Sequence, residues 1–189
     1  MAIQKKYRNI SEVNLASYDF YDLFTGTGYK NFYLADAIID STDTKILTIS
    51  QFYSDTGYTA STDMDFDITM AVPITINGDC VFNLFAANSG TSANVAFTIK
   101  FYKVNAASVE TQIGSTTTIT KSFDNSTNIL SGKATLPNTR IGAGEKLRLN
   151  IGSSNGAVRI MHDPKGRDTS ATPASFITSA SFINLPIKL

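Results

Sequence analysis

The sequence predicts an all-β protein, a single jelly-roll-like antiparallel β-sandwich with an N-terminal arm. Apolar and polar residues alternate with a period of two in several segments, as they do in strands that bury one face of an antiparallel sheet. Turn-forming residues separate these segments at regular spacing, and helical periodicity is nearly absent. With 189 residues, the chain is long enough to build one domain with a sizeable core.

The alternation is clearest in residues 95–102, where Val95, Phe97, Ile99 and Phe101 share one face. A chain of this size with antiparallel strands spaced in this way predicts a jelly roll of about eight strands. The segments in which strands are expected are residues 30–34, 45–52, 65–73, 80–86, 95–102, 109–120, 131–136, 145–152, 157–162 and 181–189.

Turn residues lie between the expected strands. Asn77-Gly78 has the composition of a two-residue hairpin turn. Ser131-Gly132 and residues 142–144 favour turns because glycine tolerates the left-handed backbone that many turns need. We therefore expect these three positions to connect strands.

Residues 1–28 do not follow the strand pattern, so we expect them to form an N-terminal arm and residues 29–189 to form the sandwich domain. The arm is too aromatic for a solvated linker and is expected to contact its own subunit or a partner. An additional strand pair of the same domain is the alternative. The candidate partner contacts in the arm are Tyr18, Phe20, Tyr21 and Phe24.

A long polar loop is expected in residues 162–174, which follow the strand over residues 157–162. Lys165, Arg167 and Asp168 place three charges close together in it. Such a cluster on a loop is either solvated or sets the register with a partner. Both interpretations stay open, and the three residues are candidate partner contacts.

Charge and hydropathy argue against two classes of ligand. Sixteen basic residues balance sixteen acidic ones, which gives no electrostatic reason to bind nucleic acid or a membrane surface. The small basic group of Lys100, Tyr102 and Lys103 is then a partner contact or a solvated face. No apolar run approaches the roughly 18 residues that a membrane span needs. The first 13 residues also lack the apolar stretch of a secretory signal.

The chain offers little for catalysis. His162 and Cys80 are its only histidine and cysteine, and no G-x-S-x-G motif is present. His162 and Asp163 suggest a general base or a metal ligand, but neighbours on a strand point to opposite faces and Asp163-Pro164 favours a turn. Cys80 stands among apolar residues as a buried hydrophobe. We predict no catalytic residues, no cofactor and no enzymatic activity.

Asp63, Asp65 and Asp67 lie two residues apart and share one face of the expected strand. A row of carboxylates can bind calcium, but the glycine that a calcium loop has at its sixth position is replaced by Ile68, and no acidic residue stands at its twelfth. We therefore predict a solvated strand face that resists edge pairing, and no metal.

Several short segments resemble tailed-bacteriophage virion structural proteins, a group that includes capsid-associated proteins. The resemblance implies a component of the virion without catalytic residues. The segments that carry it are residues 16–23 (ASYDFYDL), 26–29 (GTGY), 32–33 (FY), 144–149 (GEKLRL), 162–164 (HDP), 167–168 (RD) and 185–188 (LPIK).

On this resemblance we expect a capsid decoration or auxiliary protein that binds and stabilises the lattice of the major capsid protein. It is expected to form a homotrimer and to lie on the capsid surface of the virion, after synthesis in the host cytoplasm. A neck, tail or fibre component of the virion is the first alternative. A carbohydrate-binding adhesion module, with Tyr58 or Tyr102 stacking on a sugar, is the second.

Overall fold

The computed structural model describes residues 27–39, 42–49, 58–60, 62–88, 93–123, 127–162 and 181–188. These residues form strands and no helix, which confirms the all-β prediction, and none of them belongs to a helix that could cross a membrane. The eleven strands are β1 (Thr27–Ile39), β2 (Thr42–Thr48), β3 (Tyr58–Ala60), β4 (Asp63–Thr69), β5 (Ile74–Asn88), β6 (Ala93–Val104), β7 (Glu110–Phe123), β8 (Thr127–Ile141), β9 (Lys146–Ser153), β10 (Val158–Met161) and β11 (Phe182–Lys188).

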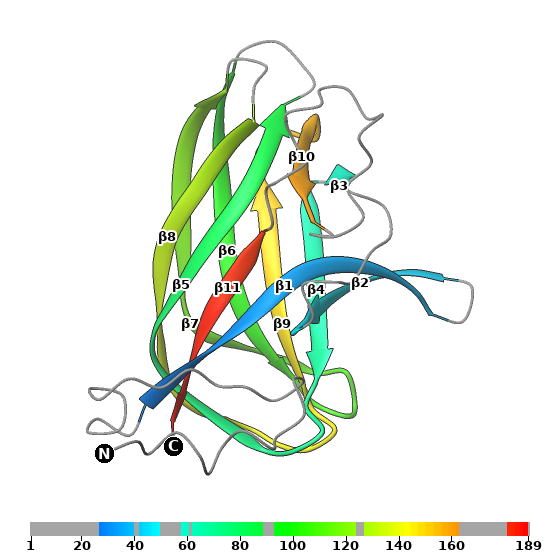
Figure 1. Cartoon of the computed structure of the whole chain (residues 1–189), viewed down its shortest axis with the longest axis vertical. Coiled ribbons are helices and arrows are strands. Elements are labelled where there is room, and N and C mark those ends of the chain that lie inside the picture. The colour runs from blue at the N-terminus through cyan, green and yellow to red at the C-terminus, as the bar shows by residue number, and fades with distance from the viewer. Residues whose placement is uncertain are drawn as a thin grey trace, which may run out of the picture.

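All eleven strands belong to one curled sheet with the order β3-β10-β5-β11-β1-β2-β4-β9-β6-β7, and β8 pairs with β5 beside this path (Figure 1). The pairs are antiparallel with one exception. β2 and β4 run parallel and pair only at Ile46 and Asp67. The purely antiparallel prediction is wrong at this point because the chain visits β3, at the edge of β10, and re-enters the sheet in the direction of β2.

The curled sheet encloses one large hydrophobic core, as expected for a sandwich, and Ala87, Met161 and Phe85 form a small separate cluster. The apolar residues that alternate with polar ones in the sequence are the residues buried in the core. In β9, for example, they are Leu147, Leu149 and Ile151. Burying a phenylalanine side chain stabilises the fold by about 1.5–3 kcal/mol. The fully buried phenylalanines are Phe32, Phe66, Phe82, Phe97, Phe101 and Phe123.

Two of the expected turns lie inside strands. Asn77-Gly78 belongs to β5, at a bulge opposite β8, and Gly78 has a φ of 122° that a bulge can require. Ser131-Gly132 belongs to β8. A Cβ at Gly132 would lie 2.7 Å from Cζ of Phe82, so glycine is needed there for close packing rather than for a turn.

The edges of the expected elements also differ from the structure. The strand expected over residues 65–73 is β4 and ends at Thr69, which leaves Val72 on an exposed turn. β3 has only three residues and was not expected. The boundary expected between residues 28 and 29 falls inside β1, which starts at Thr27, and residues 1–26 lie outside the described residues.

Ser181 holds together the junction of four strands. Its hydroxyl donates to the carbonyl of Met161, at 2.5 Å, and accepts from the backbone N–H of Phe85, at 2.9 Å. Its own carbonyl accepts from the N–H of Leu34, at 3.1 Å. The last residue of β10 and the residue before β11 therefore lie in contact, although residues 163–180, which connect them, are outside the described part of the chain.

Candidate functional site

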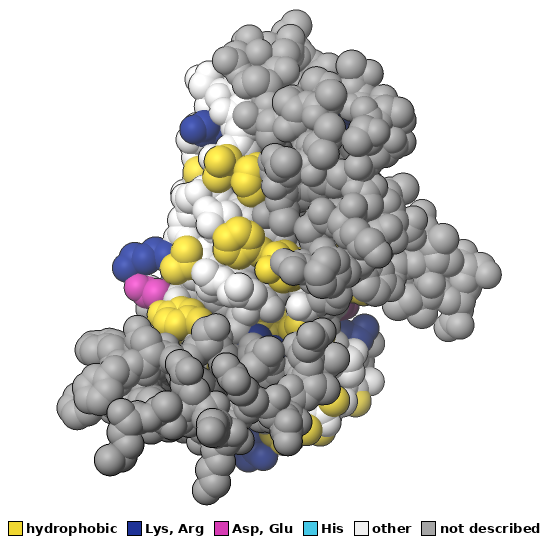
Figure 2. Space-filling view, in the orientation of Figure 1, with side chains coloured by type: hydrophobic (Ala, Val, Ile, Leu, Met, Phe, Trp, Pro, Cys, Tyr) yellow, Lys and Arg dark blue, Asp and Glu magenta, His cyan; other side chains and the backbone are white. Residues whose placement is uncertain are grey.

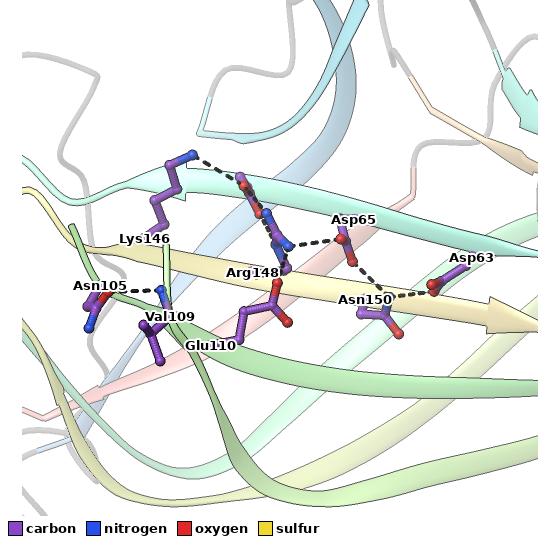
Figure 3. A network of polar contacts seen from close by, with 9 residues as sticks. Asp63, Asp65, Asn105, Val109, Glu110, Lys146, Arg148 and Asn150 are labelled. Atoms are coloured by element: carbon purple, nitrogen blue, oxygen red, sulfur yellow. Dashed lines mark hydrogen bonds and ion pairs between the residues drawn. The ribbon is translucent and has the colours of Figure 1, made fainter. Parts of the chain in front are cut away.

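The most extensive polar cluster lies on the outer face of β4 and β9 (Figure 3). On β4, Met64 and Phe66 point into the core, so the three aspartates between and beside them point outward. The register places Asp65 opposite Asn150 and Asp67 opposite Arg148. Two strands distant in the sequence thus align carboxylates with an amide and a guanidinium.

Arg148 is the centre of this cluster. Its guanidinium makes a bidentate pair with Asp67, at 2.7 and 2.8 Å, and also contacts Asp65 at 2.9 Å and Glu110 of β7 at 2.6 Å. The hydrogen bonds to Asp67 raise the pKa of Arg148, which keeps the side chain charged. One arginine therefore connects strands β4, β9 and β7.

The amide of Asn150 completes the row. This side chain is only 7% exposed, and its Nδ2 donates to Asp63 at 2.6 Å and to Asp65 at 2.7 Å. Lys146 lies 3.5 Å from Asp67. The aspartates are thus held by protein groups: the amide of Asn150 contacts Asp63 and Asp65, and the cations Arg148 and Lys146 both contact Asp67. Within the described ranges, no three histidine, cysteine or acidic side chains are grouped to hold a metal.

The prediction that the three aspartates form a solvated strand face holds for one of them only. Asp63 is exposed, whereas Asp65 and Asp67 are partly buried by their partners on β9. β4 pairs with β9 over its whole length, and its other edge pairs with β2 at one position only. The row therefore does lie beside a nearly open edge, but its main structural role is pairing with β9.

The tyrosines and lysines named as candidates do not form one surface. Lys100 and Tyr102 of β6 are half-buried and lie next to Asn150 and Arg148 in the register with β9. Lys103 pairs instead with Glu145, at 2.8 Å. Tyr58 belongs to β3, which pairs only with β10, so Tyr58 and Tyr102 are on separate parts of the sheet. No shared aromatic platform joins them within the described residues.

Glu145 occupies a small polar depression near the turn before β9. Its carboxylate receives the ion pair from Lys103 and a hydrogen bond from the N–H of Gly142, at 2.5 Å. These contacts, with Lys103 the larger, hold the pKa of Glu145 below its usual value. The depression is lined also by Arg140 and Ala143, so a carboxylate lies there between Lys103 and the N–H of Gly142.

The two residues considered for catalysis are both buried. His162 is fully buried, with its ring edge-on to Phe66 at a centroid distance of 6.1 Å. Cys80 is also fully buried, and desolvation raises the pKa of its thiol, as expected for a core cysteine. Asp163 lies outside the described residues, as do all seven candidate partner contacts. Those contacts are Tyr18, Phe20, Tyr21, Phe24, Lys165, Arg167 and Asp168.

A second surface was not recognised in the sequence. The outer face of β8, β5, β11 and β1 carries apolar side chains next to one ion pair, between Lys133 and Asp79 at 2.8 Å. Val81 and Ile129 are 39% and 52% exposed. The sequence of each strand shows the apolar residues at outward positions. It does not show that these strands pair with one another and bring those residues together.

Comparison with known proteins gives a likeness of fold. No family model and no curated protein matches the sequence. Among solved structures, the chain resembles a CocE/NonD family hydrolase from Staphylococcus aureus, with a TM-score of 0.64 and 10% identity over 87% of this chain and 37% of that one. An aminopeptidase from a marine sediment archaeon of the Thaumarchaeota follows, with a TM-score of 0.55 and 11% identity over 86% and 37%. An α-amino acid ester hydrolase matches with a TM-score of 0.54 and 12% identity, over 84% of this chain and 35% of that one.

These likenesses count against the prediction of no enzymatic activity. Hydrolases and an aminopeptidase are among the structures that it resembles with TM-scores above 0.5, so the absence of enzymatic activity does not follow from this fold. The chain spans little more than a third of each of those proteins. The likeness is therefore one of fold, shared between this chain and a part of several hydrolases.

Proposed function

We propose that this chain is a structural protein of a tailed-phage virion that binds the assembled lattice of the major capsid protein and stabilises it. The resemblance of its short segments to virion proteins supports this protein class. The observation that carries the proposal is a two-stranded ribbon that projects from the sandwich, formed by the ends of β1 and β2 (Figure 1).

Among the described residues, no strand pairs with the outer end of the ribbon on either side. β1 pairs with β11 from Thr27 to Tyr33, and Leu34 still donates to Ser181. β2 pairs with β4 only at Ile46. In the part of the chain that the structure describes, the pairs from Ala37–Thr44 to Ile39–Thr42 therefore have no third strand. An isolated two-stranded ribbon is marginally stable, and its open edges accept a strand from another chain.

A contact of this kind fits lattice binding. A ribbon that docks on a neighbouring copy uses different surfaces on the two partners, and such contacts close into rings when the rotation permits. A homotrimer on the capsid surface is the ring that we propose. Each chain that bridges capsid subunits adds contacts that must break before the subunits separate, which stabilises the shell.

The test replaces residues 36–45 by a short glycine-containing turn in the full chain. The variant is expected to keep its far-ultraviolet circular dichroism and to lose co-sedimentation with purified capsids. Val109→Ser, at an exposed turn residue away from the ribbon, is the matched control. Undiminished binding by the shortened variant would remove the ribbon as the capsid contact.

Lys165, Arg167 and Asp168 are proposed as a second contact, which is electrostatic. The double variant Arg167→Ala and Asp168→Ala should fold normally, occupy capsids less fully and lose the salt sensitivity of binding, because exposed ion pairs are screened within about 8 Å at physiological ionic strength. Full occupancy of capsids by the double variant would favour the interpretation that these residues are solvated and contact no partner. Imaging of whole particles with labelled protein separates the capsid surface from the neck, tail or fibre.

A second candidate function follows from the fold shared with hydrolases. The chain, which matches 37% and 35% of the length of two such hydrolases, would be a β-module that acts together with a hydrolytic domain. Any reaction on this chain alone would have to use groups other than His162 and Cys80, because both are buried. Assays of the purified chain with p-nitrophenyl acetate and aminoacyl-p-nitroanilides test it, and turnover that persists through purification would favour this candidate.

A further inference from the structure

Two Asn-Gly dipeptides occur in the sequence, Asn77-Gly78 and Asn155-Gly156. Glycine has no side chain to shield its backbone nitrogen, so this nitrogen can attack the side-chain amide of the preceding asparagine. The first dipeptide lies in β5, and the second lies in the turn between β9 and β10. Composition gives the two equal reactivity, so any difference between them comes from the fold.

We propose that Asn77 is a site of spontaneous deamidation and that it reacts faster than Asn155. The backbone nitrogen of Gly78 attacks Cγ of Asn77, the Cγ–Nδ2 bond breaks, and ammonia leaves with the proton of the Gly78 N–H. Water then opens the cyclic imide at one of its two carbonyls, which gives an aspartate or an isoaspartate at this position. Water is the only co-reactant, and nothing is oxidised or reduced.

The pairing of β5 with β8 is interrupted at Asn77. The register shifts between Ile76 and Gly78, so that Asn77 faces two residues of β8, Pro137 and Asn138, in place of one. Proline has no N–H to donate to the ladder. The pairing on this side therefore does not hold Asn77 in the regular geometry of a strand.

The pairing of β5 with β11 is interrupted at the same level. Residues 77–80 of β5 face only Leu185 and Pro186 of β11. A Cβ at Gly78 would lie 3.6 Å from Cβ of Pro186, so this second proline lies directly beside the dipeptide. Since neither neighbouring strand forms a regular ladder here, few hydrogen bonds have to break before Asn77 and Gly78 can reach the geometry of attack.

Asn77 is also accessible to water. Its neighbour Ile76 is fully buried, so the side chain of Asn77 points outward, where it is exposed. In the described part of the chain, this side chain makes no hydrogen bond that would have to break first. A depression of about 490 Å³ lies beside it, lined among others by Thr75, Asn138 and Ile187. Figure 2 shows few charged side chains on the side of the molecule where β5, β8 and β11 lie.

The fold holds Asn155 in place, although this residue lies in a turn. Its Oδ1 accepts from the N–H of Ala157 at 2.9 Å, and its carbonyl accepts from the hydroxyl of Ser153 at 3.0 Å and from the N–H of Val158 at 3.2 Å. Its own N–H donates to the same hydroxyl at 3.2 Å. Cγ of Asn155 can approach the nitrogen of Gly156 only after bonds of this set break, which requires local opening.

Mass spectrometry of the aged full chain tests the proposal. Wild-type protein is incubated at mildly alkaline pH, which favours loss of the proton from the attacking nitrogen. Peptide mass mapping follows the deamidated fraction at both dipeptides, and fragmentation identifies isoaspartate. A parallel incubation in urea gives the two rates without the fold. Asn77→Ser should remove the main acidic product, which anion-exchange chromatography separates because the reaction adds one carboxylate.

Deamidation is expected to be about tenfold faster at Asn77 than at Asn155 in the folded chain, and the ratio is expected to fall to within about twofold in urea. Ser153→Ala removes a hydroxyl that holds the backbone of Asn155, so it should speed the reaction there and leave Asn77 unchanged. Equal rates in the folded chain, or a faster reaction at Asn155, would overturn the proposal.

A ratio that stays the same in urea would overturn it as well, because the local sequence would then set the rates in place of the interrupted pairing. The measurement involves no capsid, so its outcome is independent of the proposed function.

Discussion

Arg148 of β9 and Asp67 of β4 form a bidentate ion pair in which both side chains are more than four-fifths buried, at 18% and 16% exposure. The pair joins residues 81 positions apart in the chain. Its geometry matches the planar guanidinium to the carboxylate, and Asp65 and Glu110 hold the same group. The outer face of this half of the sheet is therefore fixed by one cation surrounded by three carboxylates.

Replacing Arg148 by alanine should cost about 1.5–3 kcal/mol of unfolding free energy, because charged hydrogen bonds are lost and Asp67 is left partly buried without its main partner. Urea unfolding measures the change. Lys146→Ala is the matched control: Lys146 is more exposed and 3.5 Å from Asp67, so its loss should cost below about 0.5 kcal/mol. Equal effects of the two variants would contradict a central role for Arg148.

Ser181→Ala should destabilise the chain by about 1–3 kcal/mol. The substitution leaves the N–H of Phe85 and the carbonyl of Met161 without this partner at a fully buried position. Ser154→Ala is the control, because Ser154 accepts a comparable hydrogen bond from Ala96 at an exposed position where water can replace it. Thermal unfolding of both variants should separate them by several degrees.

The contact between Ser181 and Met161 also predicts that the fold tolerates replacement of the residues between them. Since Met161 and Ser181 already lie in contact, replacing residues 163–180 by a short Gly-Ser linker should keep the fold. Circular dichroism and a cooperative unfolding transition are the measurements. Loss of cooperative unfolding would show that this segment contributes to the core.

Gly132→Ala should cost about 1–3 kcal/mol, because its Cβ would lie 2.7 Å from Cζ of Phe82 in a packed core. Shortening the opposing side chain by Phe82→Leu in the same chain should recover part of this loss, so the two substitutions would be non-additive. Gly156→Ala, whose Cβ would meet Thr62 at an ordinary 3.5 Å, is the control. Strictly additive effects would contradict direct contact between Gly132 and Phe82.

The sequence contains enough information for the strands but not for their partners. β6 and β9 follow from alternation because each buries one face and leaves the other polar. Alternation cannot show that β9 lies between β4 and β6, so the contact of Arg148 with Asp67 was not predictable. The outer face of β8, β5, β11 and β1 was missed for the same reason, since its residues come from four separate strands.

Two turns were predicted wrongly because both segments contain a glycine. Asn77-Gly78 and Ser131-Gly132 have turn composition, yet the first sits at a bulge of β5 and the second makes room for Phe82. Both situations depend on a neighbouring strand, which local composition does not report. Ser181 gave no signal at all, because a lone serine before an apolar strand is unremarkable until β10 and β5 are placed around it.

Glu145 predicts a defined acid sensitivity. Its pKa in the folded chain lies below the usual value of about 4.5, chiefly through Lys103 and then through the N–H of Gly142. A lowered folded-state pKa contributes stability that is fully present above about pH 4.5 and is lost as the pH falls through the lowered value. Wild-type protein should therefore exceed Glu145→Gln in stability at pH 7, and the difference should shrink below about pH 4.5.

Urea unfolding between pH 7 and pH 3 measures this difference. Lys103→Met should also flatten the acid dependence, because it removes the larger cause of the pKa shift while leaving the carboxyl group in place. Both variants should approach the wild-type stability as Glu145 becomes protonated. A gap between wild type and Glu145→Gln that stays constant from pH 7 to pH 3 would mean that Glu145 acts through its shape and its neutral hydrogen bonds, with no contribution from its charge.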